Sequence, residues 1–479
     1  MGFVLWVGMN LLSFSEAKDL TKVLSEGMSV NAYNFNPNVA GAIAPGIAAG
    51  ISQAVTLESP QAAVSPAFAF RYNPTLTVFE RATTVPGPLF SERAMTVGRG
   101  QFNLSVGYSF IEFDDLNGTA LDDMVNPVLI STAIEGTQQP TTIIAPNGRT
   151  ALYFPTFLAA DVIRMDLKAH VIAPAIRYGI TDRWDVGLII PIVRTSLKVR
   201  TDTAYHVATP SNFADPTFGG GFLVEQDAAG NPIFSSTTST FINPDKTFPH
   251  STPDGLRFAR TQRPQTTQAK ASGSSTGVGD IMLRSKYHFW GDDLGGATWG
   301  LNLLLPSGDE DDFQGTGETH VATFLYLSQV LQERFEPHLN VGVDFNANDV
   351  DRSSFLYAVG ASVLVWNNMA LIIDFLGRSE FGRLTISEPS DSVISQYPLN
   401  RAPGTCTPQN PCQLDTTKKQ VSSFFFPETF KRNDIADFSF GVRYALGTSG
   451  SAFFGGIVPL NDDGFRANFI PSAGIEYTF

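Results

Sequence analysis

The last residues of the chain alternate between apolar and polar side chains. Ala473, Ile475, Tyr477 and Phe479 are apolar or aromatic, and the residues between them are small or polar. A period of two places the two sets on opposite faces of a β-strand. A strand at the end of a chain leaves an edge to be paired, and closing it against the first strand of a barrel satisfies that edge. The pattern therefore predicts that the chain ends in the last strand of a membrane barrel.

The same alternation starts at Gln101 and recurs to the end of the chain. It predicts twelve strands, at residues 101–113, 164–179, 184–200, 278–290, 296–305, 319–330, 336–346, 354–365, 369–381, 434–446, 451–460 and 468–479. The facing of 164–179 and 319–330 is ambiguous. The predicted fold is all-β, a transmembrane antiparallel up-and-down barrel spanning residues 101–479.

The connections alternate in length as regularly as the strands alternate in polarity. Short connections follow the even-numbered strands, whereas three very long ones, 114–163, 201–277 and 382–433, follow odd-numbered strands. Outer-membrane barrels have short periplasmic turns and long external loops. We therefore expect the bacterial outer membrane as the location, both termini in the periplasm, and the last strand paired with 101–113.

Aromatic residues gather at the ends of strands beside the short turns. An aromatic ring at a membrane interface keeps its body in lipid and its polar edge in water. The positions predict a periplasmic aromatic girdle made of Trp184, Trp290, Trp299, Trp366 and Phe479.

The residues before the barrel divide into two parts. Residues 1–17 have an apolar centre and end in Ser15-x-Ala17, a site that signal peptidase would accept, so we expect a cleaved signal peptide. Residues 18–100 form an N-terminal lead-in, with a short hairpin expected at 66–82 around Asn73-Pro74. This lead-in could lie in the periplasm, plug the lumen, or add two strands to give a barrel of fourteen.

Composition supports a wall of strands that faces lipid. Only 16% of the residues are charged, 11% are aromatic, and beyond residue 17 no apolar run is long enough for a membrane helix. The net charge of −14 argues against a nucleic-acid partner.

The positions opposite the apolar face define a candidate lumen. They are Asp280, Arg284, Lys286, His288, His338, Asn340, Asp344, Asp374, Arg378, Glu380, Asp437, Arg443 and Glu476. Charges of both signs could simply pair across the barrel, or a subset could line a path for a solute. Glu476 needs a cation, and Arg443 is the first candidate. Inward Ile189, Leu304, Leu356 and Ile372 favour a solute with an apolar body.

Two loops carry further candidate chemistry. The loop 306–318 holds Asp309, Asp311 and Asp312, but their spacing lacks the pattern of a helix-loop-helix calcium site, so a solvated external loop bridged to lipopolysaccharide is the favoured interpretation over a metal site. Cys406 and Cys412, the two cysteines of the chain, are expected to form a disulfide in the loop 382–433.

Enzyme motifs are weak. The segment 273–280 lacks the lysine of a phosphate-binding loop, and neither a G-x-S-x-G elbow nor an H-E-x-x-H metal motif is present. We expect no cofactor and no enzymatic activity, and an outer-membrane lipase is only a third hypothesis.

Four stretches resemble a known group of proteins. V-G-D-I-M-L-R-S-K-Y-H-F at 278–289, L-N-L-L-L-P-S-G-D-E-D-D-F-Q-G-T-G at 301–317, and the stretches at 176–191 and 87–102 resemble outer-membrane transporters grouped as meta-pathway phenol-degradation proteins, distantly like fatty-acid porin channels. The resemblance implies passive uptake of small hydrophobic or aromatic solutes across the outer membrane, and it transfers no site residues. The alternative is a surface protein, anchored by its barrel, whose long loops bind a protein partner or another component of a neighbouring cell surface.

Overall fold

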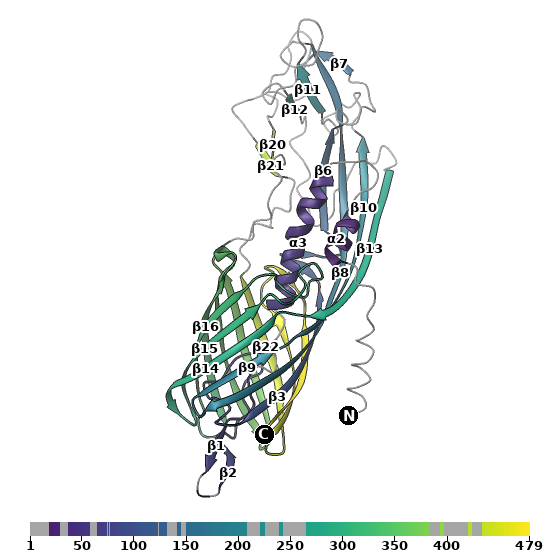
Figure 1. The fold of residues 1–479 in the computed structure, drawn as a ribbon. Helices are drawn as coiled ribbons and strands as arrows, with labels where there is room; N and C mark the ends of the chain where they lie inside the picture. The colour runs from purple at the N-terminus through teal and green to yellow at the C-terminus, as the bar shows by residue number, and fades with distance from the viewer. Residues whose placement is uncertain are drawn as a thin grey trace.

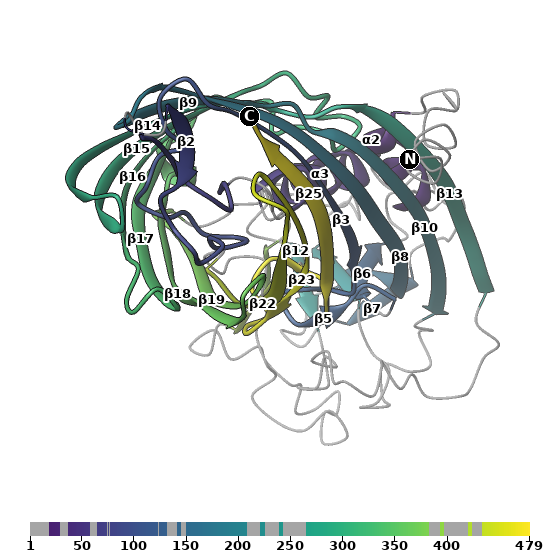
Figure 2. The same ribbon diagram turned by 90° about the horizontal axis from the view of Figure 1, so that it is seen from below.

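The computed structural model describes residues 19–28, 37–57, 65–73, 75, 77–122, 124–131, 141–144, 150–207, 221–225, 239–242, 265–382, 393–396, 420–423 and 434–479. Twelve strands of this described part close into an antiparallel barrel (Figures 1 and 2). In order around the ring they are β3 (Phe102–Phe113), β8 (Thr150–Thr181), β9 (Trp184–Ile189), β14 (Ile281–Asp292), β15 (Gly295–Leu305), β16 (His320–Gln329), β17 (Phe335–Asn346), β18 (Ser354–Trp366), β19 (Met369–Glu380), β22 (Ile435–Leu446), β23 (Gly450–Pro459) and β25 (Ile470–Thr478). The predicted twelve-stranded barrel is confirmed.

The ring closes between its first and last strands. Glu476 lies opposite Ser105 in the β25–β3 ladder. Beyond that ladder, Phe102 and Phe479 exchange both backbone hydrogen bonds, at 2.8 and 2.9 Å. The predicted pairing of the chain's last strand is therefore correct, and no edge is left at this seam.

The wall presents opposite chemistry on its two faces. On β3, Leu104 and Val106 are each 43% exposed, whereas Asn103 and Ser105 between them are 3% and 4% exposed. The same alternation continues on β17 and β19. An apolar outer face is the surface that a barrel presents to lipid.

Three strands differ from their predicted bounds. β8 has 32 residues, about 100 Å of extended chain, against an apolar band of about 25 Å in a membrane barrel. The predicted strand 184–200 is interrupted at 190–191 and resumes as β10 (Ile192–Val207), and β14 is preceded by β13 (Gln265–Val278). Both interruptions lie side by side, since Gly279 N donates to Pro191 O at 2.8 Å. Proline has no N–H for the ladder, so a break is expected there.

The extended strands form an open sheet beyond one end of the barrel. β8 pairs there with β10, β6 (Met124–Ser131), β7 (Thr141–Ile144) and β11 (Gly221–Glu225), and β11 in turn pairs with β12 (Ser239–Ile242) (Figure 1). The stretches 114–163 and 201–277 are therefore partly sheet, and the prediction that they are entirely loops was wrong. Smaller sheets join β4 (Asp115–Leu116), β5 (Thr119–Ala120) and β24 (Phe465–Arg466), and join β20 (Val393–Gln396) to β21 (Gln420–Ser423).

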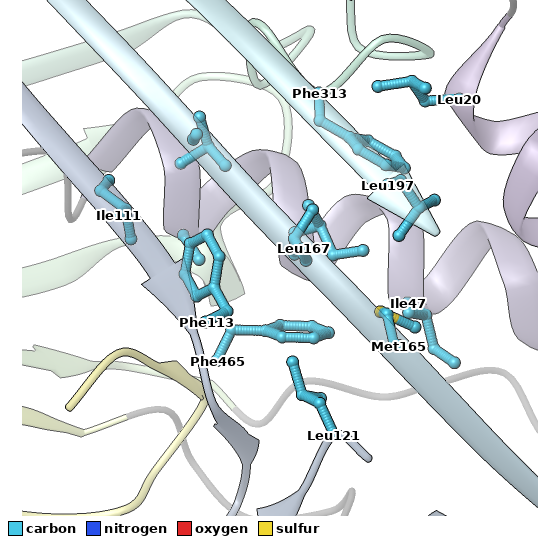
Figure 3. Close-up of a cluster of buried hydrophobic side chains, with 14 of the residues drawn as sticks. Leu20, Ile47, Ile111, Phe113, Leu121, Met165, Leu167, Leu197, Phe313 and Phe465 are labelled. Carbon is cyan, nitrogen blue, oxygen red and sulfur yellow. The ribbon is translucent and has the colours of Figure 1, made fainter. Parts of the chain in front are cut away.

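Two helices, which the sequence did not predict, pack on this open sheet (Figure 3). They are α2 (Leu20–Met28) and α3 (Pro37–Leu57), and a single turn, η3 (Val350–Arg352), lies in a loop. Leu20, Leu24 and Ile47 pack with Leu167 and Leu197 in one buried apolar cluster. Among the described residues, no helix combines the length and apolarity needed to cross a membrane.

Part of the segment that follows the helices runs inside the ring, and its hairpin projects beyond the end of the barrel (Figure 1). We call the described residues between 65 and 100 the N-terminal segment. Among the described strands, β1 (Phe70–Asn73) and β2 (Val78–Arg81) of this segment pair only with each other, so the alternative of a fourteen-stranded wall through this hairpin was wrong. The chain between β2 and β3 passes within the circle of strands when the barrel is seen end-on (Figure 2).

Candidate functional site: the interior of the barrel

One carboxylate of the N-terminal segment meets three cations of the wall. Glu92 Oε1 accepts from Arg284 Nη1 at 2.8 Å and from Arg177 Nη2 at 3.2 Å, and Glu92 Oε2 accepts from Lys286 Nζ at 3.1 Å. All four side chains are at most 8% exposed. The strands β8 and β14 deliver the cations because each residue occupies an inward position of its strand. The cluster ties the segment to one side of the wall.

The charge state of Glu92 follows from these neighbours. Burial alone raises the pKa of a carboxyl group, but the charges of Lys286, Arg284 and Arg177 outweigh burial and lower the pKa of Glu92 from 4.5 to about 2. Glu92 is therefore an anion at neutral pH.

The next residue ties the segment to another part of the wall. Arg93 forms a bidentate ion pair with Glu336 of β17, and both side chains are 0% exposed. The same guanidinium donates to Ala67 O at 2.7 Å and to Val85 O at 3.2 Å, so it also holds the segment's own turns together.

Further hydrogen bonds attach the N-terminal segment to other strands of the wall. Ser91 Oγ donates to Asp374 Oδ1 at 2.8 Å, and Asn340 Nδ2 donates to Glu92 O at 3.0 Å. Nearer the start of the segment, Ala67 N donates to Glu476 Oε1 at 2.7 Å. The N-terminal segment thus contacts β8, β14, β17, β19 and β25, which lie around the whole ring.

Glycines of the wall make room for one apolar side chain of the segment. A Cβ at Gly441 would lie 2.5 Å from Leu89 Cδ1, and one at Gly455 would lie 3.1 Å from the same atom. Leu89 is 1% exposed. Any larger residue at Gly441 would therefore collide with the segment.

A cavity of about 290 Å³ lies inside the barrel beside the segment. Phe90, Ser91 and Glu92 bound it on one side, and Leu57, the last residue of α3, also lines it. The wall contributes apolar side chains from β14 to β23, namely Met282, Leu304, Leu356, Leu376, Ile435 and Ile457. A mostly apolar cavity with a few polar groups is the usual form of a small-molecule site.

Polar side chains line the same cavity. Arg284 reaches it from β14 and Arg378 from β19. Arg378 Nη2 donates to Glu380 Oε1 at 3.2 Å, while its Nη1 is buried and has no hydrogen-bond partner among the described residues. Asn340 Oδ1 and Asp344 Oδ1, also on cavity-lining residues, lack partners in the same way. Unpaired buried polar atoms of this kind are costly unless something binds them.

The thirteen predicted lumen residues all lie on the inward side of the wall. Eleven of them are buried, and the side chains of the other two, Arg284 and Asp437, are 8% and 15% exposed. Six contact the N-terminal segment: Arg284, Lys286, Asn340, Asp374, Arg443 and Glu476. Arg443 Nη1 lies 4.0 Å from Glu476 Oε1, which is the expected pair.

The other seven bind partners elsewhere. His288 bonds Thr298, His338 bonds Asp374, Asp344 bonds His320 and Asp437 pairs with Arg466. Arg378 pairs with Glu380, which also accepts from Gln53 of α3 at 2.6 Å. Asp280 accepts from Gly308 N at 2.9 Å and from Thr316 N at 2.8 Å, so it fixes the loop between β15 and β16.

Sequence reasoning missed the central ion pairs. Glu92 and Arg93 fall in a stretch noted only for its family resemblance, and Arg177 falls in a strand of ambiguous facing. Glu336 precedes His338 by two residues, so the strand period already placed it inward.

The acidic loop is more buried than expected. Asp312 is 7% exposed and accepts from Leu20 N at 3.2 Å and Ser275 Oγ at 2.6 Å, and Phe313 beside it is 0% exposed. The expectation of a solvated loop is wrong for this half, because apolar Phe313 packs against β10 and α2. Asp309 and Asp311 remain exposed, and the described residues contain no group of three side chains suited to a metal ion. Cys406, Cys412 and residues 1–17 lie outside the described residues.

The aromatic residues beside the short turns point outward. The exposed fractions are 41% for Trp184, 68% for Trp290, 48% for Trp299, 62% for Trp366 and 58% for Phe479. Two of the indoles bond hydroxyl groups on neighbouring strands, with Trp184 Nε1 donating to Ser285 Oγ at 3.0 Å and Trp299 Nε1 to Thr323 Oγ1 at 2.8 Å. An aromatic girdle at the membrane interface stays a prediction.

Comparison with known proteins agrees with the family resemblance. Residues 253–363 match the family model described as "Putative MetA-pathway of phenol degradation". This match covers β14 to β17 and most of β18, including two of the four stretches that carry the resemblance. No curated protein sequence matches the chain.

Several solved structures are similar in outline. An outer membrane channel from Pseudomonas putida F1 has a TM-score of 0.36 at 11% identity, covering 81% of this chain and 98% of its own. The TodX monoaromatic hydrocarbon channel has a TM-score of 0.30 at 9% identity, with 86% and 96% covered. A Pseudomonas aeruginosa FadL homologue has a TM-score of 0.26 at 10% identity, with 79% and 89% covered.

Proposed function

We propose that the protein is a passive outer-membrane channel for small hydrophobic or aromatic solutes, with the N-terminal segment acting as a plug. The observation that carries the proposal is the cavity of about 290 Å³ inside a closed barrel, lined mostly by apolar side chains and bounded by Phe90 and Glu92 of the segment. A largely apolar cavity suits a solute with an apolar body. A general porin would need an open aqueous lumen instead.

The contacts of the segment support the plug. Glu92 and Arg93 form buried ion pairs with three strands of the ring, and Leu89 packs on two bare glycines of β22 and β23. Passage then requires the segment to leave at least part of these contacts, while the twelve-stranded wall stays closed.

The orientation follows from the connections. In this proposal the long extension of β8, β10 and β13 lies outside the cell, and the short turns with Phe479 lie at the periplasmic face. Solutes enter past α3, occupy the cavity and leave past the N-terminal segment. The alternative of a barrel that only anchors binding loops finds no support in the comparisons or in the described residues.

Uptake into proteoliposomes tests the proposal. Purified protein is reconstituted, and the entry of radiolabelled benzoate and glucose is measured against empty vesicles, which give the background rate through lipid. Because toluene crosses lipid unaided, its flux is measured by its uptake into cells with and without the gene. Faster entry of the aromatic solutes, with little entry of glucose, is expected. Equal rates with and without the protein for every aromatic solute would refute the channel.

A further inference from the structure

Two cations line the cavity from nearly opposite walls. The strand register leads from Arg284 of β14 to Glu380 of β19 through Asn302, Ala322, Asp344 and Ser354 on the four intervening strands. Arg378 is two residues from Glu380 on the same strand, so it lies five strands away from Arg284 in a ring of twelve. The space between them is the cavity that both residues line.

Arg284 is incompletely neutralised by its contacts. It donates to the carboxylate of Glu92 at 2.8 Å and to the neutral amide oxygen of Asn302 at 3.1 Å. The Glu92 carboxylate is shared with Arg177 and Lys286. A second carboxylate would therefore bind Arg284 favourably, because Glu92, its present partner, is shared with two other cations.

The lining of the cavity also offers polar atoms on β17 and β19. Within the described part of the chain, Arg378 Nη1 is a buried donor without a partner, and Asn340 Oδ1 and Asp344 Oδ1 are buried acceptors without one. Between the two walls, Leu304, Leu356, Leu376 and Ile457 line the cavity. A cavity of about 150 Å³ lined by aliphatic and aromatic side chains is known to hold benzene, so about 290 Å³ holds one substituted ring.

We propose that this cavity binds a monocyclic aromatic carboxylate, whose carboxylate takes the place of Glu92 on Arg284 while its ring lies against the apolar wall. The proposal rests on the channel function above and narrows its solute class from small hydrophobic or aromatic compounds to aromatic acids in their anionic form. It also gives the solute a role in opening, because displacing Glu92 from Arg284 removes one of the contacts that hold the N-terminal segment.

The mechanism makes opposite predictions for the two partners of one ion pair. Arg284→Gln removes the cation that receives the ligand, so the affinity for benzoate falls, by about tenfold or more for the loss of a charge-assisted hydrogen bond. Glu92→Gln removes the competing carboxylate and leaves Arg284 in place, so the affinity for benzoate rises severalfold. Simple damage to the fold would lower the affinity in both variants.

Titration calorimetry of the full chain in detergent provides the test, with sodium benzoate and toluene as ligands. Arg183→Gln, which removes an exposed arginine from the turn between β8 and β9, is the matched control and should bind benzoate as the wild type does. Heat-modifiable migration on gels verifies that each barrel is folded. Benzoate affinity that falls in Arg284→Gln and rises in Glu92→Gln, with toluene binding unchanged in both, supports the proposal.

Other outcomes separate the two proposals. Unchanged benzoate affinity in Arg284→Gln, or a lower one in Glu92→Gln, overturns the carboxylate site. A wild-type protein that transports toluene but does not bind benzoate overturns the carboxylate site and leaves the channel intact. A wild-type protein that neither binds nor transports either compound overturns both.

Discussion

Arg93 of the N-terminal segment and Glu336 of the barrel wall form an ion pair in which neither side chain has any solvent exposure. Two charges removed from water in this way are stable together, whereas either one alone is costly. The pair joins residues 243 positions apart in sequence, so it fixes a segment that precedes the barrel to the inside of the barrel.

Breaking this pair should release the N-terminal segment. Glu336→Gln or Arg93→Met is expected to weaken its docking by about 3–5 kcal/mol, the usual cost of leaving one buried charge unpaired. Replacing both residues with Met should cost less than the sum of the two single changes. The rate of proteolysis within residues 65–100 in intact proteoliposomes measures the docking. If the fold-change in cleavage rate in the double variant equals the product of the fold-changes in the two single variants, the two residues do not form a direct pair.

Acid should open the barrel only near the pKa of Glu92. Burial raises that pKa, but Lys286, Arg284 and Arg177 outweigh it and lower the value from 4.5 to about 2. The stabilisation from a carboxyl group with a lowered folded-state pKa is fully present above its unfolded-state pKa and is lost as pH falls through its folded-state pKa. Conductance of reconstituted protein should therefore stay at its neutral value from pH 7 to about pH 5, change little down to about pH 4, and rise as pH approaches 2. An opening transition centred at pH 4.5 would show that Glu92 is not held by these cations.

Filling the space above Gly441 should displace the segment without opening the wall. Gly441→Leu places side-chain atoms where Leu89 now packs, since even a Cβ would lie 2.5 Å from Leu89 Cδ1, and it also crowds the backbone oxygen of Phe454 on β23 at 2.7 Å. We expect a leak to small ions in planar bilayers. Gly456→Leu is the matched control, because its Cβ would collide with Phe469, which is 41% exposed on the outer face. That variant should lose stability and remain closed. Equal leaks in both variants would mean that wall damage, rather than displacement of Leu89, causes conduction.

An added charge on the outer face of the wall should lower the free energy of unfolding by an amount that depends on its depth in the membrane. Val359 lies near the middle of β18 and is 49% exposed. Arginine at the centre of the lipid-facing band of a membrane barrel costs about 2–4 kcal/mol, so Val359→Arg should lower the free energy of unfolding in lipid by that amount. Asn367→Arg, in the turn after the same strand, should change it little. Reversible unfolding in guanidinium with phospholipid vesicles measures both. Similar values for both variants would argue against a lipid-facing wall.

The ring itself could be predicted because its physical signals are local. Alternation of side chains along each strand, together with short turns such as that at residues 447–450, determined the strand order and the pairing of β25 with β3. The same alternation placed Glu336 and Lys286 inward, although Glu336 was not singled out. The pairing of Arg443 with Glu476 was predicted from the inward orientation of both side chains on their strands.

The position of the N-terminal segment inside the ring, the helix α3 and the extension of β8 could not be predicted in the same way. The positions of Leu89, Glu92 and Arg93 depend on contacts with residues far along the chain, and the segment has no period to reveal them. α3 was missed because its sequence contains Pro45 and several glycines, which favour turns over helices, and packing against α2 and Phe465 of β24 overrides that preference. The extension of β8 back to Thr150 was missed because its outer half lacks the regular alternation of a membrane strand.

A reversible disulfide between the N-terminal segment and the wall tests the plugged channel most directly. Ser91 Oγ and Asp374 Oδ1 lie 2.8 Å apart, so cysteines are placed at these two positions, with Cys406 and Cys412 replaced by serine, and formation of the disulfide is verified by mass spectrometry before transport is measured. Cysteines at Ser109 and Ser472, whose hydroxyl groups are 2.9 Å apart on β3 and β25, form the matched control within the wall.

The central claim predicts a clear difference between these two variants. Under oxidising conditions, benzoate entry into proteoliposomes should stop in the Ser91→Cys/Asp374→Cys protein and return on adding dithiothreitol, while the Ser109→Cys/Ser472→Cys protein transports in both states. Transport that continues unchanged through a fully oxidised Ser91→Cys/Asp374→Cys protein would contradict the claim that residues 65–100 close the channel.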